Sequence, residues 1–138
     1  MQTIKGAFDL TLVPQDLAFT HEEAGLGRMS IDKRLHGELD ATSKGEMLSA
    51  MSAVKGSAGY VAMERVTGTI QGRKGSFVLQ HSATMNRGVQ SMSITVVPDS
   101  GTDELEGLQG SLIIDIVDGK HYYTFTFEIN GEERRKNG

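Results

Sequence analysis

Glu64 and His81 are the two residues of this sequence whose chemistry is most useful in combination. Each lies in a run of alternating apolar and polar residues, and each occupies a position of the apolar set. A buried carboxylate has its charged form disfavoured, whereas a neighbouring imidazolium or ammonium group stabilises that form. A buried Glu-His pair can therefore exchange a proton near neutral pH, as general acid/base catalysis requires. Such a pair can equally be a structural contact, and the sequence leaves both alternatives open.

The turn between the two runs decides whether Glu64 and His81 meet. We expect Gly72-Arg73 to form a two-residue type II′ loop, because this turn requires glycine at its first position. The resulting pairs, from the turn outward, are Ile70–Gly75, Gly68–Phe77, Val66–Leu79, Glu64–His81, Ala62–Ala83 and Tyr60–Met85. Directly opposed residues have Cβ atoms about 5 Å apart. Lys33 has the inward parity of an earlier run, and it could also pair with Glu64.

A second turn is predicted at Asp118-Gly119. Asp-Gly between two alternating runs is typical of a type I′ hairpin, in which both central residues have positive φ. The expected pairs are Val117–Lys120, Ile116–His121, Ile114–Tyr123, Leu112–Phe125 and Gly110–Phe127. The large apolar residues then share one face of the hairpin, and the other face carries mainly polar residues.

Alternation with a period of two residues recurs along the chain, and helical periodicity is almost absent. The first expected strand carries Ile4, Phe8, Leu10 and Leu12 on one face and stops at Pro14. The other expected strands are 28–41 with a bend at Gly37, 46–52 after a turn at Ser43-Lys44-Gly45, 57–70, 75–85, 89–97 and the two strands of a hairpin that ends at Ile129. These strands predict an all-β fold, a single eight-stranded antiparallel up-and-down β-barrel, because closure removes exposed sheet edges. A two-sheet sandwich is the main alternative. We expect residues 1–130 to form this domain and the polar tail 131–138 to be disordered.

Composition excludes several classes of function. The chain has 138 residues, no cysteine and a net charge of −4 with both signs interspersed. We therefore expect no disulfide, thiol nucleophile, cofactor or nucleic acid partner. Glu64, His81 and His121 lack the spacing of a metal site, so we expect no metal. No apolar run approaches the ~20 residues of a membrane helix, and residues 1–8 do not resemble a signal peptide, so we expect a cytoplasmic protein without a membrane partner.

Several strings of the sequence resemble one bacterial family that is known only as a domain of unknown function. They are Gly56-Ser57-Ala58-Gly59-Tyr60-Val61-Ala62-Met63-Glu64-Arg65, Gly75-Ser76-Phe77-Val78-Leu79-Gln80-His81, Val96-Val97-Pro98-Asp99-Ser100-Gly101-Thr102 and Glu104-Leu105-Glu106-Gly107-Leu108-Gln109-Gly110. The resemblance implies a barrel similar to that of allene oxide cyclase. It implies no activity, because a shared fold does not determine a function.

In an up-and-down barrel, the turns after the odd-numbered strands lie at one end. We expect the long polar connection 14–27 to cover this end as a mobile roof. The candidate ligand-binding residues on the inner face are Tyr60, Glu64, Leu79, His81, Met85, His121, Tyr123 and Phe125, and the candidate catalytic residues are Glu64 and His81. A polar cluster on an apolar floor is typical of a small-molecule site.

Three functions follow from this arrangement. The first is binding of a small, partly apolar molecule inside the barrel. The second is an acid/base enzyme, of isomerase or cyclase type, that uses Glu64 with His81. The third is a barrel filled by its own side chains that acts only in self-association or in binding another protein. Val61, Met63 and Val78 are expected on the outer face, and they are the candidate contact of a homo-oligomer.

Overall fold

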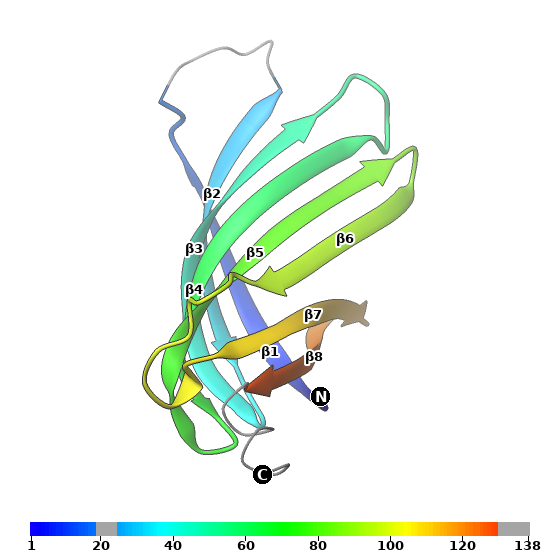
Figure 1. Cartoon of the computed structure of the whole chain (residues 1–138). Helices are drawn as coiled ribbons and strands as arrows, with labels where there is room; N and C mark the ends of the chain where they lie inside the picture. The colour runs from blue at the N-terminus through cyan, green and yellow to red at the C-terminus, as the bar shows by residue number, and fades with distance from the viewer. Residues whose placement is uncertain (19–24, 130–138) are drawn as a thin grey trace.

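The computed structural model describes residues 1–18 and 25–129 (Figure 1). The strands are β1 (Gln2–Gln15), β2 (Leu26–Leu35), β3 (Leu39–Met51), β4 (Ala58–Ile70), β5 (Arg73–Asn86), β6 (Val89–Val96), β7 (Leu108–Val117) and β8 (Lys120–Ile129). A short 3-10 helix, η2 (Asp103–Leu105), lies between β6 and β7. None of the described helical segments is long and apolar enough to cross a membrane. The tail 131–138 and residues 19–24 of the expected roof lie outside the described residues.

The strands form one closed antiparallel barrel, which confirms the predicted fold class (Figure 1). Each strand pairs with its neighbours in sequence, and β1 closes the barrel by pairing with β8 from Gln2–Phe127 to Phe8–His121. Short turns favour this arrangement, since antiparallel strands need only a tight connection. The turns after β1, β3, β5 and β7 therefore lie at one end, and those after β2, β4 and β6 lie at the other.

The β7–β8 hairpin has the predicted register. Val117 pairs with Lys120, and the ladder continues through Leu112–Phe125 to Gly110–Phe127. Asp118 has a φ of 52° and Gly119 a φ of 77°, as a type I′ turn requires. The local turn chemistry is therefore sufficient to determine which face of each strand is buried.

The β4–β5 hairpin differs from the prediction by two residues. The loop is Gln71-Gly72, with φ values of 52° and 84°, so Ile70 pairs with Arg73 rather than with Gly75. The predicted pairs Gly68–Phe77 and Glu64–His81 are therefore wrong, and Val66–Phe77, Glu64–Leu79 and Ala62–His81 replace them. Because side chains alternate with a period of two, a shift of two residues keeps every side chain on its expected face.

The β2–β3 hairpin was also predicted incorrectly. The expected strand 28–41 is interrupted at residues 36–38, where Gly37 has a φ of 102°, and its second part continues through Ser43-Lys44-Gly45 as β3. Gly45 lies within β3, and a Cβ there would approach the carbonyl oxygen of Met63 to 2.1 Å, so the close packing of β3 on β4 requires glycine at this position. One expected strand is divided and its end joins the next, so the barrel still has the expected number of strands.

Side chains fill the end of the barrel that holds the turns after β2, β4 and β6. Phe125 stacks between Phe77 and Phe127, with ring centroids 5.7 and 5.1 Å away. Leu105 of η2 belongs to the same buried cluster, so the connection between β6 and β7 contributes to the core at this end. Burial of these large side chains supplies much of the hydrophobic stabilisation of the fold.

β6 and β7 diverge toward the opposite end (Figure 1). Within the described part of the chain they pair at one position, Thr95 with Ser111, whereas β5 and β6 pair from Leu79–Val96 to Asn86–Val89. The barrel is therefore closed by its ladder near the filled end and is more open between these two strands at the other end.

The outer face of β4 and β5 agrees with the alternation of the sequence. Val61 and Met63 are exposed, as predicted. Val78 is instead half-buried, because the connection after β6 covers it. The Val78 N–H donates to Ser100 Oγ at 3.1 Å, and the Val97 N–H donates to the Val78 carbonyl at 2.9 Å.

Candidate functional site

A pocket of about 200 Å³ occupies the interior of the barrel toward the open end. Most of its wall is apolar and comes from β1, β2, β3, β4, β6 and β7. These apolar residues are Phe8, Leu10, Leu12, Ile31, Met47, Ala62, Met92, Ile114 and Ile116. The polar residues of the lining are Lys33, Tyr60, His81 and His121. Few polar groups on an otherwise apolar wall are characteristic of small-molecule pockets.

Glu64 connects two of these polar residues at the base of the pocket. Lys33 Nζ lies 3.1 Å from Glu64 Oε1 and 3.0 Å from Oε2, and His81 Nε2 lies 3.2 Å from Oε1. All three side chains are buried, and Glu64 is only 2% exposed. We call Lys33, Glu64 and His81 the buried triad.

The register of the strands explains how the triad assembles. Ala62 is the direct partner of His81, and Glu64 lies one inward position further along β4, so His81 reaches it diagonally. Lys33 must reach across β3 to meet Glu64. Ser43 is the β3 residue opposite Lys33, and Gly45 is the one opposite Glu64, so small residues leave space for the lysine side chain. Ser43 Oγ is itself buried without a hydrogen-bond partner among the described residues.

The contacts of Glu64 determine its ionisation. Burial by itself raises the pKa of Glu64, but the hydrogen bond from His81 and the positive charge of Lys33 outweigh burial and hold the pKa below its ordinary value. Glu64 is therefore a carboxylate at neutral pH and accepts hydrogen bonds. Since a carboxylate cannot donate, His81 must carry a proton on Nε2, and its Nδ1 is the ring nitrogen that remains for another partner.

Aromatic rings surround the triad. Lys33 Nζ lies 5.0 Å from the centroid of the Phe8 ring, within the range of a cation–π contact. The Tyr60 ring lies 6.3 Å from that of His81. Burial, together with the negative charge of Glu64, raises the pKa of Tyr60, so its hydroxyl stays protonated and can donate a hydrogen bond at neutral pH.

The structure brings together about half of the site residues predicted from the sequence. Tyr60, His81 and His121 line the pocket, and Glu64 lies at its base. The other predicted residues lie elsewhere: Leu79, Tyr123 and Phe125 are fully buried in the hydrophobic core, and Met85 is 40% exposed. Met85 lines a separate shallow groove near the turns after β3 and β5.

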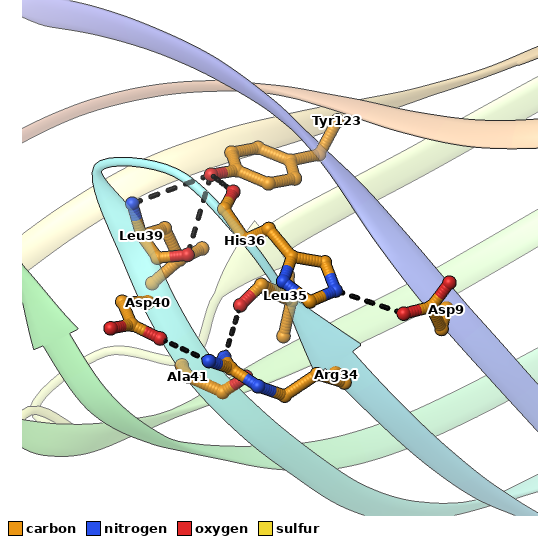
Figure 2. Close-up of polar contacts among 8 residues, drawn as sticks. All are labelled: Asp9, Arg34, Leu35, His36, Leu39, Asp40, Ala41 and Tyr123. Carbon is orange, nitrogen blue, oxygen red and sulfur yellow. Dashed lines mark hydrogen bonds and ion pairs between the residues drawn. The ribbon is translucent and has the colours of Figure 1, made fainter.

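Tyr123 has a structural role at the filled end (Figure 2). Its hydroxyl donates to the His36 carbonyl at 2.6 Å and accepts from the Leu39 N–H at 3.3 Å, so it ties β8 to the β2–β3 turn. A Cβ at Gly6 would lie 2.5 Å from this hydroxyl, which explains glycine at that position. Tyr123 therefore explains the turn at residues 36–38, which local sequence signals did not predict.

Surface contacts hold the same turn from outside (Figure 2). Arg34 donates to the Ala41 carbonyl at 3.0 Å and pairs with Asp40 at 2.6 Å, and His36 Nε2 lies 2.8 Å from Asp9 Oδ2. This cluster is at the end of the barrel opposite the pocket mouth.

Several pocket residues were not identified from the sequence as site residues, including Phe8, Ile31, Met47, Met92 and Ile114. Their inward parity is visible in the alternating pattern of each strand. Their height in the barrel depends on pairing between distant strands and on the true β2–β3 turn, and the sequence pattern does not contain this information. Among the described residues, no group of three His, Cys, Asp or Glu side chains is arranged to hold a metal ion.

The model of a family described as a protein of unknown function (DUF3224) matches residues 4–127. The chain belongs to the DUF3224 family. A crystal structure of a DUF3224 protein of unknown function from Shewanella oneidensis is similar to it, with 51% sequence identity and a TM-score of 0.89. The similarity covers 94% of this chain and 97% of that chain. A search of curated proteins finds no significant match. The DUF3224 assignment confirms the resemblance seen in the sequence.

Proposed function

We propose that this DUF3224 protein binds a small, partly apolar molecule in the interior pocket, with the polar end of the molecule at Lys33 and His81. The observation that carries the proposal is the buried triad at the base of an otherwise apolar pocket of about 200 Å³. An engineered apolar cavity of about 150 Å³ holds benzene, so the volume suits a molecule of roughly that size or slightly larger.

Energetics favour this proposal over a barrel that is merely filled. Ionised groups lose hydration when they are buried, and replacing a buried ion pair with apolar residues is often neutral or stabilising. An apolar core would therefore serve a purely structural barrel at least as well as Lys33, Glu64 and His81 do. A function in ligand binding gives the triad a reason to be buried beside a pocket.

We also propose that the protein is cytoplasmic and that it associates with a second copy of itself. Leu48, Val61 and Met63 support self-association, since each is 52% exposed on the outer face of β3 and β4. Leu48 and Val61 are direct cross-strand partners, and Met63 pairs with Glu46 nearby. Adjacent exposed apolar residues are more suggestive of a contact than scattered ones.

An acid/base enzyme is the second candidate, and the Glu64–His81 contact favours it. An ionised carboxylate that accepts from Nε2 fixes the tautomer of the imidazole and leaves Nδ1 as the ring nitrogen that can accept a proton. A molecule in the pocket could then lose a proton to Nδ1. If the protein only binds, a bound compound should be recovered chemically unchanged and should not exchange carbon-bound hydrogen for deuterium in D₂O.

Methionine methyl NMR tests the proposed binding in the intact protein. Met47 and Met92 line the pocket, whereas Met51 and Met63 are exposed elsewhere and are internal controls. In a screen of small molecules, a true ligand should shift the Met47 and Met92 signals and leave those of Met51 and Met63 in place. Compounds that stabilise the protein without moving the pocket signals would contradict the proposal, because the stabilisation would come from another site.

A further inference from the structure

The base of the pocket presents more free hydrogen-bond donors than free acceptors. Glu64 Oε1 accepts from Lys33 and His81. Glu64 Oε2 accepts no hydrogen bond among the described residues, but it is buried and ion-paired with Lys33 at 3.0 Å, so Nδ1 of His81 is the acceptor of the buried triad that remains open to a ligand. Lys33 has a third ammonium hydrogen, and Tyr60 contributes a protonated hydroxyl. The complementary ligand group is a strong acceptor with several lone pairs.

The charges at the base limit how negative that acceptor can be. Lys33 and Glu64 carry opposite charges and contact each other directly, so together they are neutral. The groups that face His81 are Glu64 and Tyr60 from β4, Lys33 from β2 and, across the pocket, His121 from β8. Its partners from β6 are apolar, since Ile94 pairs with it and Met92 lines the pocket. Among residues 1–18 and 25–129, Lys33 is the one lysine or arginine that lines the pocket, so no second fixed cation of this part of the chain balances a buried anion there.

We infer that the ligand is a small apolar carboxylic acid, which binds as its carboxylate, and this inference rests on the proposed function. When the carboxylate binds, His81 takes up one proton from solvent. The proton adds to Nδ1 of His81, whose Nε2–H remains bonded to Glu64. The imidazolium then balances the ligand charge, and Lys33 and His81 both donate to the carboxylate. A dianion such as a phosphate monoester would exceed this balance by one charge, and a cation would be repelled by Lys33.

The pocket volume sets the size of suitable probes. Benzoate, phenylacetate and hexanoate have an apolar body comparable to the benzene that fills an apolar cavity of about 150 Å³. Their primary amides are matched in shape and are neutral, so they accept hydrogen bonds without requiring a proton. A comparison of acid and amide therefore isolates the charge from the fit.

Isothermal titration calorimetry on the intact protein tests the inference. Titrations at about pH 8 are run in phosphate and in Tris, whose ionisation enthalpies differ. We expect at least one carboxylate to bind at least about tenfold more tightly than its amide, with uptake of about one proton per complex and an affinity that falls about tenfold per pH unit above pH 8. Amides that bind as tightly as the acids, or acids that bind without proton uptake, would overturn the inference.

Two variants locate the proton. His81→Gln should abolish proton uptake and weaken the carboxylate more than the amide. His36→Gln removes a histidine at the filled end and should leave both quantities as in the wild type. Proton uptake that persists in folded His81→Gln would overturn the assignment to His81, and the wild-type titration stands even if this variant fails to fold.

The outcome also separates this inference from the proposed function. If a neutral compound shifts the Met47 and Met92 signals while no carboxylate binds, the proposed function stands and the carboxylate inference fails. If neither the probes nor a broad screen move these signals, both fail.

Discussion

Two opposing effects act on the ionisation of Glu64. Nearly every other carboxylate of the described barrel stays in contact with solvent and is not subject to them. It is 2% exposed, which disfavours its charge, and it is contacted by Lys33 and His81, which favour that charge. The net result is a lowered pKa. Predictions at the scale of single residues follow from this balance.

Removing the charge of Glu64 should leave Lys33 buried without a partner. Glu64→Gln keeps the shape of the side chain, and we expect it to lower the free energy of unfolding by about 3–5 kcal/mol. The double variant Glu64→Gln with Lys33→Met removes both charges and should recover much of this loss. Urea unfolding of the wild type and both variants measures the effect. A single variant as stable as the wild type would show that Lys33 does not depend on Glu64.

The stability of the protein should also depend on the ionisation of Glu64. Because its folded-state pKa is lower than the ordinary value of 4.5, the carboxylate stabilises the fold above that value. This contribution should be lost as the pH falls from about 4.5 through the lower pKa of the folded state. The difference in unfolding free energy between wild type and Glu64→Gln should be constant above this window and shrink within it. A difference that does not change with acid pH would contradict the lowered pKa.

Residue types and parity predicted much of the candidate site. The alternating pattern placed Glu64, His81 and Lys33 on the inner face, and all three meet there. Tyr123 shows the limit of this approach, because its inward parity was correct but its hydroxyl binds the backbone of a distant turn. Parity identifies the face of a strand, whereas the level within the barrel depends on long-range pairing.

At the scale of elements, each hairpin was predictable only as far as its turn residues required a particular conformation. Asp118 and Gly119 both favour positive φ, and the predicted register is correct. Gln71 also has positive φ, but glutamine gives no signal for it, and the β4–β5 register was displaced by two residues. The turn at residues 36–38 is hydrogen-bonded to Tyr123, which is far away in the sequence, so the local pattern does not reveal this contact.

Two glycines should respond differently to substitution by alanine, because Gly72 lies in the β4–β5 turn and Gly45 lies within strand β3. Gly72 has a φ of 84° and open space around it, so Gly72→Ala should cost about 1–2 kcal/mol of backbone strain. Gly45 lacks positive φ, but an added Cβ would lie 2.1 Å from the Met63 carbonyl oxygen and 2.7 Å from Glu64 Cβ. Gly45→Ala should therefore separate β3 from β4 and disturb the triad.

Chemical denaturation and the Met-methyl spectrum together distinguish these effects. We expect Gly45→Ala to be the more destabilising change and the one that shifts the signals of Met47 and Met63, which flank Gly45 on β3 and β4. Equal losses of stability, with Met47 and Met63 unmoved in both variants, would contradict the close packing of these strands at Gly45.

At the scale of the whole molecule, the barrel combines a filled end with an open end. The stacked Phe77, Phe125 and Phe127 and the buried Leu105 stabilise one end, and the pocket occupies the other. β6 and β7 diverge from each other toward this end (Figure 1). Met92, Ile114 and Ile116 from these strands line the pocket. This separation allows stability to come from one half of the barrel while the other half holds charged groups.

The outer face makes a separate prediction about assembly. If Leu48, Val61 and Met63 form a subunit contact, the wild type should sediment as a dimer and Val61→Glu should sediment as a monomer of unchanged fold. Ile113→Glu is a matched control, since Ile113 is exposed on β7 away from this patch. A wild type that remains monomeric at high concentration would contradict the contact.

The interior pocket is smaller than a second hollow on the outer face. The position of a bound ligand therefore decides between the two as the binding site. A hollow of about 650 Å³ lies on the outer face of β3, β4 and β5, where the exposed Leu48, Val61 and Met63 form part of its wall. The lining of this hollow combines exposed apolar residues with the surface pair Arg28 and Glu46, so its charged groups are open to solvent. The buried triad therefore favours the interior as the binding site.

A crystal structure of the protein with its tightest-binding compound tests this account most directly. The account predicts density for the compound inside the barrel, with its polar end within hydrogen-bond distance of Lys33 Nζ and His81 and its apolar body against Phe8, Met92 and Ile114. Density in the outer hollow or in the groove at Met85, with the interior pocket free of the compound, would contradict it.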